Sequence, residues 1–141
     1  MHKLLLSGFF LLLVLPGPAQ NFIGRKAEEI RKYMTTEQNN FSLDETTVNK
    51  VYKYLKYVDE METRTALYFL SDDDVCTWYK VVYDNDLLPS VIAGLDSTCR
   101  KVSDTLWLEK SGENTCQKIL KRQDWFFTVI TKPVEQDTVK Q

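Results

Sequence analysis

The chain has 141 residues with 18 basic and 20 acidic side chains, so its formal charge near pH 7 is −2. Charges of both signs are interspersed, and no basic stripe of the kind that binds phosphate backbones is present, so we expect no nucleic-acid partner. The length fits a single domain with one hydrophobic core.

The first twenty residues have the pattern of a cleavable secretory signal peptide. Lys3 precedes an apolar stretch at 4–15, and a Pro-Gly-Pro-Ala segment at 16–19 supplies a helix breaker and small residues for cleavage. A membrane-spanning helix needs roughly 20 apolar residues, and this stretch ends well short of that. We therefore expect cleavage after Ala19, a secreted or periplasmic protein, and no membrane span after the signal peptide (1–20) is removed.

Cleavage would also remove the only histidine, His2. Without an imidazole, most familiar catalytic and metal-binding arrangements are unavailable, including serine hydrolysis with a histidine base. Three consecutive aspartates at 72–74 are typical of a solvated turn rather than of a calcium loop. We expect no catalytic residue, no bound metal ion and no cofactor. The alternative is a small extracytoplasmic hydrolase that uses paired carboxylates.

Periodicity predicts one helix and then three strands in the first half of the chain. Residues 23–34 place apolar side chains on one helical face and charged side chains on the other. From 48 to 58 the pattern alternates with period two and is rich in β-branched and aromatic types, which predicts a strand. Further strands are expected at 63–70 and 75–83, separated by polar turns.

The same order recurs in the second half. Asp84 and its neighbours offer a helix N-cap, and residues 88–99 place apolar side chains on one face of a short helix. Strands are expected at 101–109, 116–121 and 124–131. Ile30 and Leu95, central on the two apolar stripes, should anchor the helices.

These elements predict an α+β fold of two tandem α-β-β-β units, with helices packed on one face of an antiparallel sheet. The domain is expected to occupy residues 21–133 and to be followed by a polar C-terminal tail at 134–141.

The helix opened by Ile23-Gly24, the strand at 76–83, the Trp107 strand and the closing Trp125-Phe126-Phe127 strand resemble small uncharacterised extracytoplasmic proteins of Bacteroidetes-type bacteria. The tandem order also resembles the β-lactamase-inhibitor-protein fold and outer-membrane-assembly lipoproteins of the SmpA/OmlA type. The resemblance implies binding to another protein. The chain departs from the lipoprotein group, because its first cysteine is Cys76 and no acylated cysteine follows the apolar stretch.

Three cysteines, Cys76, Cys99 and Cys116, can form at most one internal disulfide bond, and three pairings are open. Their spacings contain no paired C-x-x-C element, which argues against a metal site. The simplest interpretation is that they are small buried apolar residues.

The candidate binding residues are Tyr52 and Tyr54, which alternate onto the same face of the predicted 48–58 strand. A tyrosine-rich sheet face left uncovered by helices suits recognition of a protein or peptide, because tyrosine offers a large contact area at small entropic cost. The alternative is ordinary packing of tyrosine rings across neighbouring strands. We predict a non-enzymatic binding module.

Overall fold

The computed structural model describes residues 21–45 and 52–134. The predicted signal peptide, residues 135–141 of the predicted tail and the first part of the 48–58 strand lie outside these ranges. Two helices and eight strands form the described fold, in chain order α1 (Ala27–Thr36), β1 (Phe41–Leu43), β2 (Tyr54–Asp59), β3 (Arg64–Leu70), β4 (Cys76–Asp84), the 3-10 turn η1 (Asn85–Leu87), α2 (Leu88–Thr98), β5 (Arg100–Ser103), β6 (Leu106–Ser111), β7 (Asn114–Arg122) and β8 (Phe126–Pro133).

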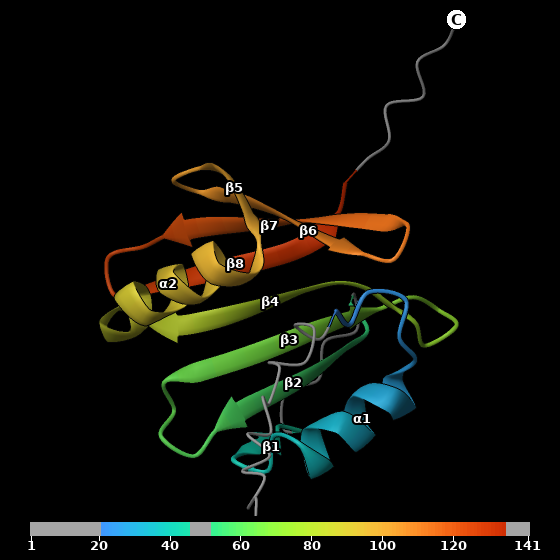
Figure 1. Cartoon of the computed structure of the whole chain (residues 1–141). Coiled ribbons are helices and arrows are strands. Elements are labelled where there is room, and N and C mark those ends of the chain that lie inside the picture. Colours follow the sequence, from blue (N-terminus) through green and yellow to red (C-terminus); the bar gives the residue numbers. More distant parts are fainter. Residues whose placement is uncertain (1–20, 46–51, 135–141) are drawn as a thin grey trace, which may run out of the picture.

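The strands make one antiparallel sheet in the order β1-β2-β3-β4-β8-β7-β6-β5 (Figure 1). The last strands of the two halves, β4 and β8, therefore meet at its centre. The mixed α+β class agrees with the sequence prediction, but the prediction of three strands in each half is wrong, because each half has four. Strand β1 is too short to show an alternating pattern, and the predicted 101–109 strand is broken into β5 and β6 by a turn at Asp104-Thr105.

Helix α1 begins at Ala27, later than the predicted residue 23. The preceding segment runs alongside the start of β4, because the Gly24 N–H donates to the Cys76 carbonyl at 2.8 Å and the Cys76 N–H donates to the Arg25 carbonyl at 2.8 Å. Gly24 has φ +82°, a left-handed conformation that glycine adopts without strain. Pairing with β4 therefore replaces the first helical turn.

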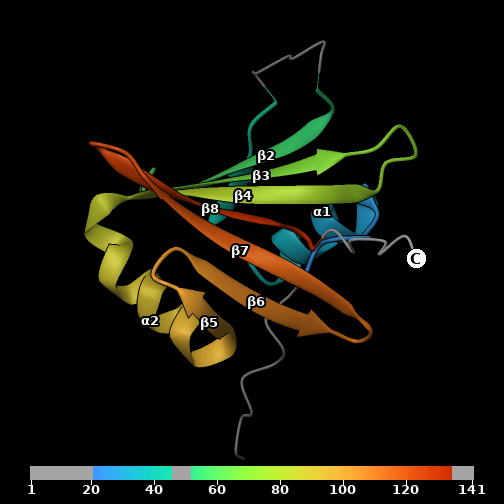
Figure 2. The same cartoon turned by 90° about the horizontal axis from the view of Figure 1, so that it is seen from above.

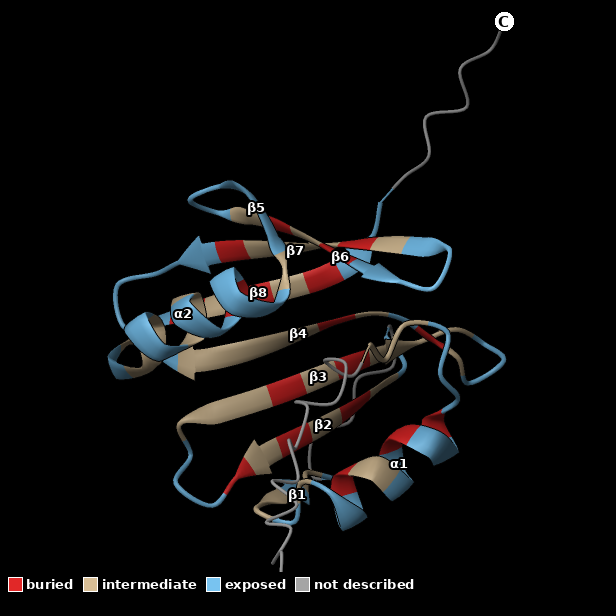
Figure 3. Cartoon of the chain, in the orientation of Figure 1, coloured by how far each residue is buried: buried red, intermediate tan, exposed pale blue. Residues whose placement is uncertain are grey.

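Each helix packs on its own cluster of buried side chains. In α1, Ile30 is 0% exposed and contributes to the same cluster as Tyr57 and Tyr68. In α2, Leu95 packs in a second cluster with the fully buried Trp107. Figure 3 shows buried segments along the strands and on α1.

The two clusters of buried side chains lie on the same face of the sheet. Tyr79 of β4 belongs to the α1 cluster, and Tyr83 packs against the α2 cluster. Alternate residues of a strand point to the same face, so Tyr79 and Tyr83 share a face. Figure 2 shows both helices on the same side of the sheet. No helix of the described ranges lies on the opposite face, which we call the outward face.

Asp59 closes the turn between β2 and β3. Its carboxylate accepts hydrogen bonds from the Thr63 N–H at 2.8 Å and the Arg64 N–H at 3.0 Å, and from the Thr63 hydroxyl at 2.9 Å. Nε of Arg64 lies 3.2 Å from the same carboxylate. Burial raises the pKa of Asp59, but these hydrogen bonds outweigh it and the net pKa lies below its usual value.

No helix within residues 21–45 and 52–134 is long and apolar enough to cross a membrane.

Candidate functional site

Strand β2 places Tyr54 on the outward face. Leu55 and Tyr57 are buried, while Tyr54 and Lys56 alternate with them and are only partly buried. Tyr52 precedes the strand and is 59% exposed. Tyr57, in contrast, belongs to the α1 cluster, so alternation along β2 divides its tyrosines between core and surface.

Tyr52 and Tyr54 both contact the ring of Phe69, which lies on the neighbouring strand β3. The Tyr52 ring meets Phe69 edge-on at a centroid distance of 6.3 Å, and the Tyr54 ring lies 5.8 Å away at a tilt of 48°. Phe69 in turn stacks on Trp78 of β4 at 3.9 Å with an interplanar angle of 5°. We call these four residues the aromatic cluster.

The surroundings of the aromatic cluster are apolar and basic. Leu67 of β3 pairs with both Lys56 and Lys80, and Lys80 pairs with Ile130 of β8. The Lys80 ammonium lies 5.9 Å from the centre of the Phe69 ring, within reach of a cation–π contact. The outward face thus joins aromatic rings, aliphatic side chains and cations across the middle of the sheet.

Alternation along the 48–58 segment predicted Tyr52 and Tyr54 as binding residues, whereas Phe69 and Trp78, which complete the aromatic cluster, were not predicted. The alternating pattern of β3 contained the signal for Phe69, since Ala66 and Tyr68 occupy the opposite face. Trp78 required the register, because β3 and β4 shift by one residue beside Phe69. An irregularity of this kind changes which side chains share a face.

The remaining tyrosines of the first half serve the core more than the surface. Tyr68 and Tyr79 are buried beneath α1, and burial raises the pKa of both phenols. Phe22 packs edge-on against each of them, at 4.9 Å and 5.5 Å. The abundance of tyrosine in this half is therefore mainly a packing feature.

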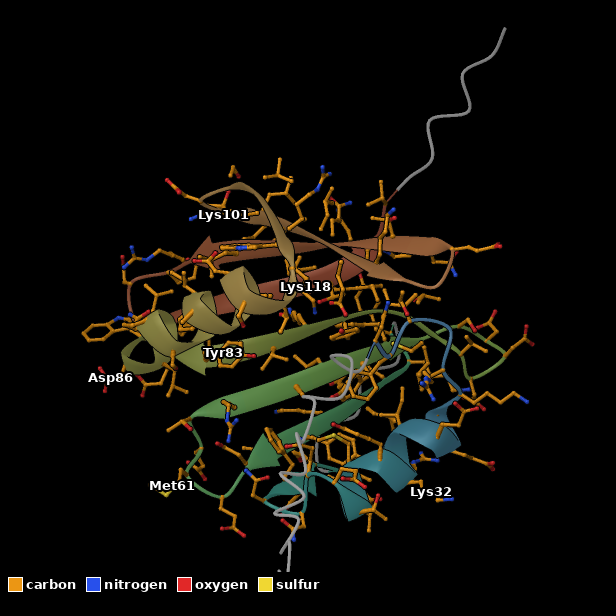
Figure 4. The ribbon with its side chains drawn as sticks, viewed as in Figure 1. Lys32, Met61, Tyr83, Asp86, Lys101 and Lys118 are labelled. Carbon is orange, nitrogen blue, oxygen red and sulfur yellow. The ribbon has the colours of Figure 1, made fainter. Side chains whose placement is uncertain are left out.

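A polar cluster, separate from the aromatic cluster, surrounds Lys118 of β7 on the helix-covered face (Figure 4). Its ammonium is 3.3 Å from the Glu109 carboxylate, and it donates to the Thr131 hydroxyl at 3.2 Å and to the Tyr79 hydroxyl at 3.4 Å. Burial lowers the pKa of Lys118, but Tyr79 and Glu109 outweigh this effect and the net pKa is raised. A lysine held in its charged form is a poor nucleophile, so we interpret the cluster as structural.

The three cysteines are free thiols in separate surroundings. Cys76 is 1% exposed in the α1 cluster, and desolvation raises the pKa of its thiol to about 12. Cys116 is also buried and accepts a hydrogen bond from the Asn21 side chain at 3.1 Å. Cys99 is half-buried, with its sulfur 3.9 Å from Glu109. Burial of the first two agrees with their interpretation as small core residues.

Two open grooves of about 580 Å³ each lie beside β6 and β7. One has Glu113 in its lining and the other has Glu109, so neither brings together the two carboxylates that the hydrolase hypothesis requires. In the part of the chain that the structure describes, no three cysteine or acidic side chains gather closely enough to hold a metal ion.

No protein family, curated protein or solved structure that was compared matches this chain. The resemblance to the β-lactamase-inhibitor and SmpA/OmlA folds therefore stays a prediction from the order of elements, and the aromatic cluster stands as the candidate site on its geometry alone.

Proposed function

We propose that the chain is a secreted or periplasmic binding module that recognises another protein through its outward sheet face. The observation that carries this proposal is the aromatic cluster, in which three large rings each contact the ring of Phe69 on a face that neither helix covers. Aromatic side chains are enriched in the centres of protein interfaces.

The alternative is that the rings only stabilise the sheet. Cross-strand aromatic pairs do contribute to stability. Tyr52 argues for a further role, because it lies outside the strand and is 59% exposed. A ring needed only for sheet packing would gain more from being buried. Phe126 of β8 is also 41% exposed, on the same face by alternation with Phe127.

The proposal is tested by affinity capture from the fluid into which the host secretes proteins, with three forms of the protein as bait. Wild type is compared with a Tyr52→Ala/Tyr54→Ala double variant and with Trp125→Ala. Trp125 is a suitable control, because it is 85% exposed but lies in the turn before β8, away from the aromatic cluster. Circular dichroism and urea unfolding establish that each bait is folded.

We expect a partner that wild type and Trp125→Ala retain and that the double variant loses. Retention by all three baits would show that binding uses another surface. Failure to find any partner that distinguishes the double variant from wild type would count against a binding role for the outward face.

A further inference from the structure

The outward face has a charge opposite in sign to that of the whole chain. Strand alternation assigns to this face the basic residues Lys56, Lys80, Arg100, Lys110, Lys121 and Lys132. The one acidic strand residue that alternation places there is Asp84, at the exposed end of β4. The full chain nevertheless has a formal charge of −2. Within the described ranges, most acidic residues lie in turns and helices rather than on the strands.

Most of these cations are available to a partner. Lys56 is paired with Asp44 at 3.2 Å. Within the described ranges, no ion pair engages Lys80, Lys110, Lys121 or Lys132. Unpaired cations beside apolar rings attract anionic groups and set the rate and specificity of association.

The orientation of the rings distinguishes between classes of anionic partner. Phe69 and Trp78 lie opposite each other on neighbouring strands and stack face to face at 3.9 Å. Their planes must therefore stand upright from the sheet, with edges pointing outward and one face of each ring covered by the other. Tyr54 lies at 5.8 Å from Phe69 and restricts access to that ring further.

Nucleic-acid binding by a sheet uses ring faces on which bases stack. Upright rings that present their edges do not supply such a platform. They leave an uneven apolar surface between cations, which suits apolar and carboxylate side chains alternating along a polypeptide. The geometry favours a protein segment over an oligonucleotide.

We propose that the outward face binds an acidic polypeptide segment, with Lys80 and Lys132 contacting its carboxylates and the aromatic cluster contacting its apolar side chains. This inference rests on the proposed function and adds the chemistry of the partner. Lys80 flanks the Phe69 ring, and Lys132 pairs with Gln117 on the neighbouring strand, so the two cations lie on central strands of the sheet.

The probe is a short fluorescein-labelled poly-L-glutamate, and binding is followed by fluorescence anisotropy. The variants are Lys80→Glu and Lys132→Glu. Lys32→Glu is the matched control, because it makes the same charge change on the exposed side of α1. Unlabelled oligo(dT) and polygalacturonate serve as competitors. An unlabelled peptide of alternating glutamate and leucine, which adds the apolar side chains that poly-L-glutamate lacks, is titrated against wild type and Tyr54→Ala to test the aromatic cluster.

We expect poly-L-glutamate to bind wild type, and Lys80→Glu and Lys132→Glu each to weaken binding by about tenfold or more, while Lys32→Glu changes it less than about twofold. The alternating peptide should compete more strongly than unlabelled poly-L-glutamate for wild type, and Tyr54→Ala should remove that advantage. Added salt should weaken binding, since surface charge interactions are screened. Poly-L-glutamate that does not bind, or equal weakening by Lys32→Glu, would overturn the acidic-peptide proposal. Stronger competition by oligo(dT) or polygalacturonate than by unlabelled poly-L-glutamate would overturn it in favour of nucleic acid or an acidic polysaccharide.

The two proposals can fail separately. If the secreted partner distinguishes the tyrosine double variant from wild type but is insensitive to Lys80→Glu and Lys132→Glu, the outward face is a binding surface for a partner that is not acidic. If neither tyrosine nor lysine substitutions alter any interaction, both proposals are wrong.

Discussion

Replacing Lys118 with methionine removes the charge that neutralises Glu109 and leaves most of the side-chain volume in place. Only 12% of the Lys118 side chain and 9% of the Glu109 side chain are exposed. In the variant, Glu109 would keep the thiol of Cys99 at 3.9 Å as its side-chain partner among the described residues. A buried carboxylate with so weak a partner is costly.

Breaking a buried ion pair by removal of one partner destabilises a protein by about 3–5 kcal/mol. That is a large share of a typical stability of about 5–15 kcal/mol. Replacing both members by apolar residues avoids the unpaired charge and is often nearly neutral. In the double variant Lys118→Met/Glu109→Leu, the hydroxyls of Tyr79 and Thr131 lose a donor. We expect a cost of about 1–2 kcal/mol for the double variant, from two hydrogen bonds.

Urea unfolding followed by tryptophan fluorescence measures these differences, because Trp107 is fully buried in the α2 cluster and its environment changes on unfolding. Both single variants, Lys118→Met and Glu109→Leu, are compared with the double variant and with wild type. The coupling free energy from this cycle isolates the pair from its surroundings.

The pair also predicts a loss of stability at alkaline pH. Because the folded pKa of Lys118 is raised, the stability it contributes is fully present below the unfolded value of about 10.4 and is lost as the pH rises through the folded pKa. Buried tyrosines also titrate in this range, so the informative quantity is the difference in free energy of unfolding between wild type and the double variant. This difference should shrink as the pH rises. A Lys118→Met variant within about 1 kcal/mol of wild type, or a double variant as unstable as the sum of the singles, would refute this reasoning.

Four further outcomes are expected. Ile30→Ala should lower the free energy of unfolding by about 2–5 kcal/mol because Ile30 is 0% exposed, whereas Glu29→Ala should change it by less than about 0.5 kcal/mol, and urea melts compare the two. Cys76 should resist iodoacetamide in native protein near neutral pH and react only in denaturant, because burial raises its pKa to about 12, and mass mapping of the alkylated peptides measures this. Asp59→Asn should lower the free energy of unfolding by about 1–3 kcal/mol, because the carboxylate accepts hydrogen bonds from Thr63 and Arg64. Folding lowers the pKa of Asp59, so its contribution to stability is present above about pH 4 and is lost as the pH falls through the folded pKa. Urea unfolding of wild type and Asp59→Asn at decreasing pH should therefore show the difference in their free energies of unfolding becoming smaller. Intact-mass spectrometry of protein from its host should find a chain that begins at Gln20 or at the next residue, and recovery of the uncleaved chain from membranes would contradict the signal-peptide prediction.

Sequence patterns were most informative where the alternation was long and regular. The 63–70 and 75–83 predictions correspond to β3 and β4 within one residue at each end, because each has enough alternating residues to define two faces. Strand β1 has three residues, too few for a periodic pattern, and was not predicted. Most of β5 was predicted as part of a single 101–109 strand, and because β5 is exposed along its whole length, no change of pattern marked the turn that separates it from β6.

For the candidate site too, alternation within one strand was predictable, whereas contacts between strands were not. Alternation along 48–58 predicted that Tyr54 lies opposite Leu55 and Tyr57, and β2 has this arrangement. It could not show that Phe69 and Trp78 lie beside Tyr54, since pairing between strands depends on register and on the irregularity after Phe69. The same limit applies to the mostly buried Lys118, because its carboxylate partner, Glu109, lies on another strand.

The sequence by itself determined the α+β class, the amphipathic helices and the inner and outer faces of the longer strands, because these depend on local periodicity and on burial of apolar side chains. Only the tertiary structure decided that β4 and β8 meet at the centre of one sheet, that α1 begins after a segment paired with β4, and that rings and lysines from several strands gather on the outward face. These features depend on contacts between residues far apart in the chain, and no local pattern specifies such contacts.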